Sequence, residues 1–175
     1  MKPFVLVGTV LLSVIAMAQQ SKSPASDVLR EMLGGRERNI VAAFELMPAD
    51  KFGYRRFHDE MAFGQLAAAF VSRNYLYCSS VGDVARPETE ELKGTEDKDK
   101  LVASIRASFA FCREALANAD DAKMSETITM NGRPCLRAWA FMGLVVMWAD
   151  HYQAVSMDLR LNGLSPPSAQ PHANQ

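Results

Sequence analysis

His151 is the residue of this chain whose type and setting best suit chemistry. It lies in the stretch VVMWADHYQAVS (145–156), where the spacing of apolar residues predicts a helix. A neutral imidazole can ligate a metal ion or act as a general base near neutral pH. The alternative is a buried ring held by a hydrogen bond, which the apolar neighbours favour. Asp150 is adjacent in sequence but points about 100° away around a helix.

Three cysteines offer a second kind of chemistry. Cys78 and Cys112 fall near the ends of two predicted helices. If those helices are parallel, the two axial positions differ by about 3 Å at the helical rise, and a disulfide is possible in an oxidising compartment. An antiparallel pair would separate them by about 20 Å and leave two buried thiols that behave as small hydrophobes. Cys135 is predicted to begin the last helix, where the dipole lowers a thiol pKa, but no base or second cysteine completes a redox motif.

Composition favours one domain with a proper core. The chain has 175 residues, of which 49% are hydrophobic, and its formal net charge is −1. The charge balance and the lack of a basic cluster argue against a nucleic-acid partner, because such binding depends on neutralising phosphates.

The N-terminus has the features of a signal peptide. Lys2 precedes the apolar run FVLVGTVLLSVI, and AMA (16–18) supplies small residues at a cleavage site. The run is shorter than the roughly 18 to 20 residues that span a bilayer. We therefore expect residues 1–18 to be removed, no membrane anchor to remain, and the bacterial chain to be periplasmic or secreted.

The mature chain is predicted to be all-α. Helical periodicity and helix-end signals place four helices at about 23–46, 59–80, 95–116 and 134–161. No run of strand period is evident, so residues 19–164 are predicted to form a four-helix bundle. Residues 165–175, which follow the last helix and are rich in proline and small residues, are predicted to be a disordered tail.

Loop lengths restrict the topology. The link between the second and third helices has about 15 residues and can reach about 50 Å, whereas the second helix is only about 30 Å long. The chain can therefore cross the whole bundle and begin the third helix parallel to the second. The spacing allows this arrangement without requiring it.

Several strings together resemble one known family. LMPADKFGY (46–54), MAFGQLAAAFVSRNYLYCSS (61–80), LVASIRASFAFCREAL (101–116) and DHYQAVSMDLRLNGLSPPS (150–168) are similar to the DinB-like family, in order and over essentially the whole mature chain. The resemblance implies an up-down-down-up bundle. It also implies a divalent metal, zinc or nickel, held by one histidine of the second helix and two of the last helix, four residues apart.

The resemblance fails at two of the three histidine positions. They fall on Ala69, Met147 and His151, so only His151 keeps a ligand. Alanine cannot ligate, and a thioether is a poor ligand for zinc or nickel. His58 precedes position 69 by about 16 Å of helix, and His172 lies in the tail, so neither rebuilds the site.

We therefore expect an exported bundle with a degraded metal site and no cofactor. Its function is predicted to be non-catalytic, with a small apolar ligand bound in a pocket near Ala69, Met147 and His151. The alternative is a zinc- or nickel-dependent hydrolase or thiol transferase that uses His151 with unidentified ligands; Glu45 and Asp158 would reach it only if the fold allowed. A third hypothesis is a protein that works as a homodimer, by analogy with the family.

Overall fold

The structure is a computed structural model that describes residues 21–170. Its elements are α1 (Pro24–Leu46), η1 (Ala49–Lys51), α2 (Phe63–Gly82), α3 (Lys98–Ala117), η2 (Asp121–Lys123), β1 (Thr127–Met130), β2 (Arg133–Leu136), α4 (Arg137–Leu161) and η3 (Pro167–Ala169). The predicted signal peptide, 1–18, and residues 171–175 of the predicted tail, His172 included, lie outside the described residues.

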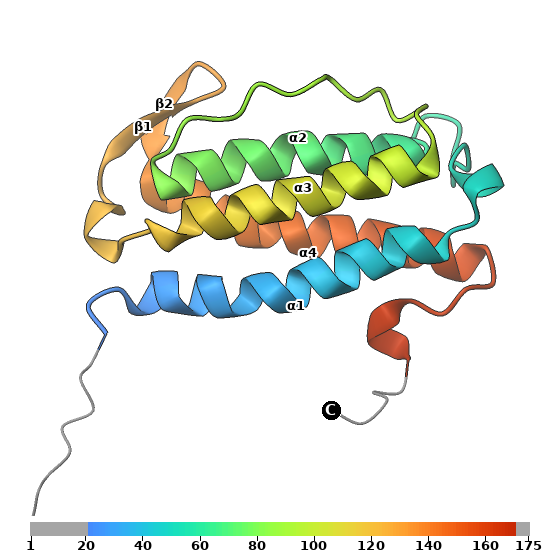
Figure 1. The fold of residues 1–175 in the computed structure, drawn as a ribbon, viewed down its shortest axis with the longest axis horizontal. Helices are drawn as coiled ribbons and strands as arrows, with labels where there is room; N and C mark the ends of the chain where they lie inside the picture. The colour runs from blue at the N-terminus through green and yellow to red at the C-terminus, as the bar shows by residue number, and fades with distance from the viewer. Residues whose placement is uncertain (1–20, 171–175) are drawn as a thin grey trace, which may run out of the picture.

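The four long helices pack as a bundle in which α1 and α4 run in one direction and α2 and α3 in the other (Figure 1). Contacts between helix ends agree with these directions. Ser23, before α1, donates a hydrogen bond to Asp120, after α3, at 2.9 Å. Arg137, which begins α4, donates to the carbonyl of Ser80, near the end of α2, at 2.6 Å.

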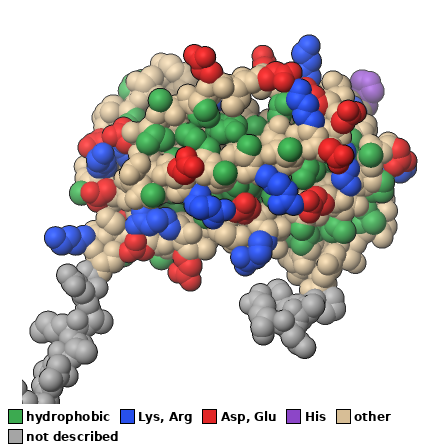
Figure 2. Space-filling view, in the orientation of Figure 1, with side chains coloured by type: hydrophobic (Ala, Val, Ile, Leu, Met, Phe, Trp, Pro, Cys, Tyr) green, Lys and Arg blue, Asp and Glu red, His purple; other side chains and the backbone are tan. Residues whose placement is uncertain are grey.

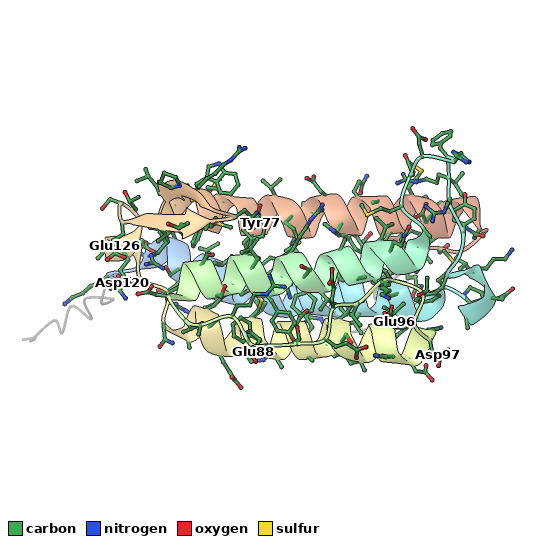
Figure 3. All side chains as sticks on the ribbon, turned by 90° about the horizontal axis from the view of Figure 1, so that it is seen from above. Tyr77, Glu88, Glu96, Asp97, Asp120 and Glu126 are labelled. Carbon is green, nitrogen blue, oxygen red and sulfur yellow. A yellow bond between two sulfur atoms is a disulfide. The ribbon has the colours of Figure 1, made fainter. Side chains whose placement is uncertain are left out.

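A crossing segment, residues 83–97, makes the parallel α2–α3 pair possible. It leaves the end of α2, passes along the bundle and delivers the chain to the start of α3 at the other end (Figure 1). Figure 3 shows Glu88 along this segment, with Glu96 and Asp97 at the start of α3 and Asp120 and Glu126 at the opposite end. The length of this connection therefore allows α3 to run parallel to α2.

Helices α2 and α3 approach each other closely where α2 carries glycine. A Cβ atom added at Gly82 would lie 2.2 Å from the carbonyl oxygen of Ala115 on α3. The same close approach allows the disulfide between Cys78 and Cys112, whose Cα atoms are 5.1 Å apart. The pairing considered for parallel helices is thus the one that the structure contains.

The core contains one polar side chain that joins three helices. Asn74 of α2 is fully buried, and its Oδ1 accepts a hydrogen bond from Nε1 of Trp148 on α4 at 2.8 Å. Its Nδ2 donates to Oγ of Ser108 on α3 at 3.0 Å. Apolar residues surround the group, with Phe109 packed between Phe70 and Trp148.

The expectation of a purely α-helical chain is wrong at one place. Strands β1 and β2 form an antiparallel hairpin, with Thr127 opposite Leu136. Asn131 and Gly132 form its turn, and both have positive φ, of 49° and 74°. Two successive residues with positive φ fit the twist of a two-residue hairpin. The fold is therefore a helical bundle with a small hairpin.

The hairpin also moves the start of the last helix. α4 begins at Arg137, not at about 134, and Cys135 lies in β2. The argument that a helix dipole activates this thiol is therefore wrong. The second and third helices likewise begin later than expected, at Phe63 and Lys98.

Both ends of the described chain are held by side-chain contacts. The carboxylate of Asp121 accepts hydrogen bonds from the backbone N–H groups of Ala25 and Ser26, and so caps α1. Residues 165–170, assigned from the sequence to a disordered tail, are instead packed: the N–H of Ser168 donates to the hydroxyl of Tyr152 at 2.8 Å, and η3 contacts α1.

The surface is mixed in charge. Figure 2 shows acidic and basic side chains interspersed on the face that it displays, with no extended area of one sign. Among the helices of residues 21–170, none combines the length and the apolar character that crossing a membrane requires.

Candidate functional site

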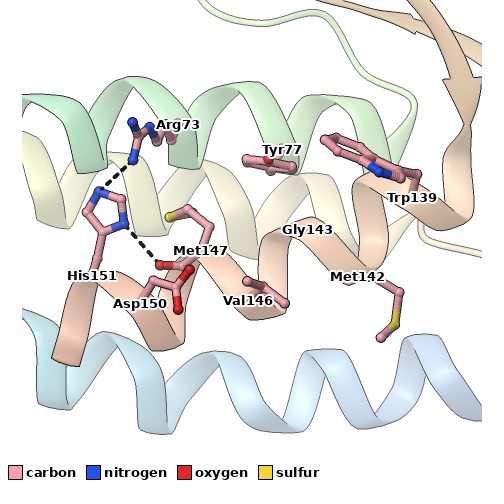
Figure 4. Close-up of a pocket in the computed structure, with 9 residues that line it drawn as sticks. All are labelled: Arg73, Tyr77, Trp139, Met142, Gly143, Val146, Met147, Asp150 and His151. Carbon is pink, nitrogen blue, oxygen red and sulfur yellow. Dashed lines mark hydrogen bonds between the residues drawn. The ribbon is translucent and has the colours of Figure 1, made fainter. Parts of the chain in front are cut away.

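The candidate site is a groove between α2 and α4, with a cavity of about 410 Å³. We call it the α2–α4 groove (Figure 4). Its lining residues are Arg73, Tyr77, Trp139, Met142, Gly143, Val146, Met147, Asp150 and His151. A volume of this size lies within the range of small-molecule sites in proteins.

His151 closes one end of the groove with both ring nitrogens engaged. Its side chain is buried, and Nδ1 lies 3.0 Å from the backbone carbonyl oxygen of Met147. Its Nε2 lies 3.4 Å from Nη1 of Arg73 on α2. A carbonyl can only accept and a guanidinium can only donate. Nδ1 therefore carries the proton, and Nε2 offers its lone pair to Arg73.

This environment favours the neutral imidazole. Burial lowers the pKa of His151 below its ordinary value, and the positive charge of Arg73 acts in the same direction. The hydrogen bond to Met147 and the charge of Asp150 oppose the shift without reversing it. The ring is thus a neutral acceptor that faces a fixed cation.

Aromatic rings form the other end of the groove. Tyr77 of α2 and Trp139 of α4 are stacked, with centroids 6.3 Å apart and planes inclined by 25°. Figure 3 shows Tyr77 on the side of α2 that faces α4. A Cβ atom at Gly143 would lie 2.6 Å from the Tyr77 ring, so the missing side chain lets the ring lie against α4. Trp139 remains 57% exposed, which leaves one ring open to a ligand.

The three residues predicted to share a pocket are not all brought together. Met147 and His151 line the α2–α4 groove, one helical turn apart. Ala69 instead lines a separate cavity of about 570 Å³ between α2 and the crossing segment. Two other α2 side chains reach His151: the Phe70 ring packs edge-on against the imidazole, with centroids 5.5 Å apart, and Arg73 faces its Nε2. Sequence reasoning identified neither contact.

The other residues considered as partners of His151 have different neighbours. His58 is exposed in the loop between η1 and α2. Glu45 pairs with Arg106 on α3. Asp158 lies two helical turns beyond His151 on α4 and pairs with Arg56, as described below.

The donor set around His151 does not suit a divalent metal ion. Within residues 21–170, no three His, Cys, Asp or Glu side chains come together as metal ligands would. The lone pair that a metal would use, on Nε2, faces the guanidinium of Arg73. A second cation there would meet like-charge repulsion in a partly buried place.

Another cavity, of about 380 Å³, lies beyond Arg73 and His151. Its lining includes the ionisable side chains of Arg56 and Glu60. Nε of Arg56 lies 3.0 Å from a carboxylate oxygen of Asp158 and 3.0 Å from one of Glu60. Neither contact has the geometry of a hydrogen bond, although the atoms are buried. Burial raises the pKa of Asp158 to about 6, against the opposing attraction of Arg56.

The raised pKa of Asp158 predicts a stability change with pH. Between about pH 4 and pH 6 the native chain binds the proton more tightly than the unfolded chain, so the free energy of unfolding falls as pH rises and then levels off. Asp158→Asn removes this loss. Relative to wild type, the free energy of unfolding of the variant should rise by up to about 3 kcal/mol across that range. Denaturant unfolding at a series of pH values measures this difference.

Asp150→Asn is the matched control, because it removes an exposed carboxylate from the same helix. If the stability advantage of Asp158→Asn over wild type instead shrinks as pH rises, the attraction of Arg56, and not burial, dominates the pKa shift of Asp158.

The fold is similar to a crystal structure of a DinB-like protein from Bacillus cereus, with a TM-score of 0.65 and 15% identity, over 78% of this chain and 92% of that one. This chain has the DinB-like fold. No protein-family model matches the sequence, and no curated protein matches it at a significant level. At this identity the likeness establishes the fold of the DinB-like bundle and nothing about its chemistry.

Proposed function

We propose that this DinB-like bundle is a non-catalytic binding protein that takes a small, largely apolar ligand in the α2–α4 groove. One observation carries the proposal: the guanidinium of Arg73 faces Nε2 of His151, beside a cavity whose walls are mostly apolar and aromatic. The lone pair on Nε2 thereby accepts from Arg73. A general base or a metal ligand would need that same lone pair.

The walls of the groove support ligand binding on physical grounds. Trp139, Met142 and Val146 lie on one face of α4, and each side chain is more than half exposed. Exposed apolar side chains that line a concave surface gain free energy when a ligand removes them from water. The Tyr77 ring lies against Gly143 and so presents a flat aromatic wall, which suits molecules with flat or linear apolar parts.

A thermal-shift screen of small molecules tests the proposal. A ligand present at about one hundred times its Kd stabilises the native state by about 2.7 kcal/mol, which for a domain of this size raises Tm by about 5 to 10 °C. Compounds that stabilise wild type should lose that effect in Val146→Lys, which puts a charged chain into the groove.

Val28→Lys supplies the matched control for this screen. Val28 is 54% exposed on α1, and Val146 is 52% exposed in the groove, so the two substitutions change similar surfaces. Stabilisation that survives in Val146→Lys, or a homodimer whose interface covers Trp139 while no small molecule stabilises the chain, would contradict the proposal.

A further inference from the structure

Arg73 carries a positive charge that the described protein leaves unbalanced at close range. Within residues 21–170, no carboxylate oxygen forms an ion pair with its guanidinium. Other surface arginines are also unpaired, but Arg73 is the arginine that lines the α2–α4 groove. Its Nη1 faces the neutral ring of His151, at the long distance of 3.4 Å from Nε2. Most of its five N–H donors therefore remain for another acceptor.

The nearest acidic residue of the groove does not serve as that acceptor. In Figure 4, the carboxylate of Asp150 points away from the Arg73 guanidinium, with the His151 ring at the left of both. The two side chains belong to opposite rims, Arg73 to α2 and Asp150 to α4. The positive charge of the groove thus lies on its α2 rim and the negative charge on its α4 rim.

Arg73 also lies where two cavities meet. It lines both the α2–α4 groove and the cavity of about 380 Å³ beyond His151. The groove side has one carboxylate, that of Asp150, and is otherwise apolar toward the stacked Tyr77 and Trp139. The far side adds the carboxylates of Asp59 and Glu60. A ligand whose acidic group rests on Arg73 would therefore place its apolar part toward Trp139, away from these carboxylates.

We propose that the ligand of the α2–α4 groove is an amphipathic carboxylic acid. Its carboxylate pairs with the guanidinium of Arg73, and its apolar chain lies along α4 toward the Tyr77–Trp139 stack. This inference rests on the proposed function and adds the charge and the orientation of the ligand.

Length is consistent with this orientation. His151 and Trp139 are twelve residues apart on α4, which is about 18 Å along the helix axis. A linear acyl chain or a flat ring system fits such a groove end to end. A planar guanidinium matches the two oxygens of a carboxylate, so Arg73 favours an acid over an alcohol of the same length.

Three probes of equal chain length test the proposal: dodecanoate, dodecanol and dodecyltrimethylammonium, each below its micelle concentration. Binding is followed by the fluorescence of Trp139, because the other tryptophan, Trp148, is fully buried. Trp139→Phe should abolish the signal. Dodecanoate should bind wild type about 10- to 100-fold more tightly than dodecanol, as charge-assisted hydrogen bonds imply.

Arg73→Gln should weaken dodecanoate binding by about 10- to 100-fold and so abolish the preference for the acid over dodecanol. Arg73 is exposed, so the substitution does not disturb the core. Arg133→Gln removes the same charge from the exposed strand β2 and should change neither affinity.

The outcomes separate this inference from the proposed function. Equal binding of acid and alcohol, insensitive to Arg73→Gln, would overturn the carboxylate and leave an apolar-ligand groove. Tighter binding of the ammonium probe would overturn it in favour of a cationic ligand. Failure of all three probes would overturn this ligand class, while the wider thermal-shift screen decides on the groove itself.

Discussion

Reduction of the Cys78–Cys112 disulfide is expected to lower the free energy of unfolding by about 3 to 4 kcal/mol. The bond joins residues 34 apart in sequence, and opening a loop of this length returns that much conformational freedom to the unfolded chain. Both cysteines are fully buried, so the two thiols gain no contact with water in the reduced native state that would offset this loss of stability. Urea unfolding of the oxidised and reduced protein measures this free-energy difference. Thermal unfolding should show a fall in Tm of about 10 °C on reduction.

The third cysteine provides the control for this experiment. Cys135→Ser should leave both the oxidised stability and the reduction effect unchanged, because this thiol is free and lies in β2. Identical unfolding curves for oxidised and reduced wild type would contradict the covalent link between α2 and α3.

Replacement of Asn74 by alanine is expected to destabilise the chain by about 2 to 4 kcal/mol. The substitution leaves Nε1–H of Trp148 without an acceptor in the core and removes the donor to Ser108. An unsatisfied buried polar group carries its full desolvation penalty, and the lost volume adds a cavity term. The measurement is equilibrium denaturation in urea.

Gln153→Ala is the matched control for Asn74→Ala, because it removes an exposed amide side chain from α4. It should change stability by less than about 0.5 kcal/mol. A cost of Asn74→Ala no larger than that of the control would show that the three-helix polar contact does not stabilise the bundle.

Much of the helical architecture follows from the sequence alone. Apolar spacing identifies all four helices, and the length of the crossing segment allows the parallel α2–α3 pair that the structure contains. The hairpin was missed because its strands have four residues each, too short for a clear alternating pattern. Its one local signal was Asn131-Gly132, a pair typical of two-residue hairpin turns, inside TITMNGRPCL.

The candidate site was less predictable than the fold. His151 and Met147 follow from the resemblance and from helical spacing, but Arg73 does not. An arginine on a predicted helix is normally a solvated surface residue, and nothing in its neighbours signals that it reaches across to α4. The role of Gly143 is equally hidden, because the space it leaves is defined by the Tyr77 ring of another helix.

The site has a simple physical interpretation. The resemblance in sequence implies a divalent cation held by histidines of the last helix, whereas the cation beside His151 in this structure is the side chain of Arg73. A covalently attached charge needs no other ligands, so alanine at 69 and methionine at 147 are compatible with it. The apolar volume nearby is then available to a ligand, which is the basis of the proposed function.

The number of divalent ions bound per chain tests this account most directly. Purified wild type, exposed to zinc or nickel and then dialysed, should retain substoichiometric metal, equal to that retained by His151→Ala, when measured by elemental analysis. One equivalent of metal in wild type that is lost in His151→Ala would contradict the account, and the groove would have to be treated as a metal centre.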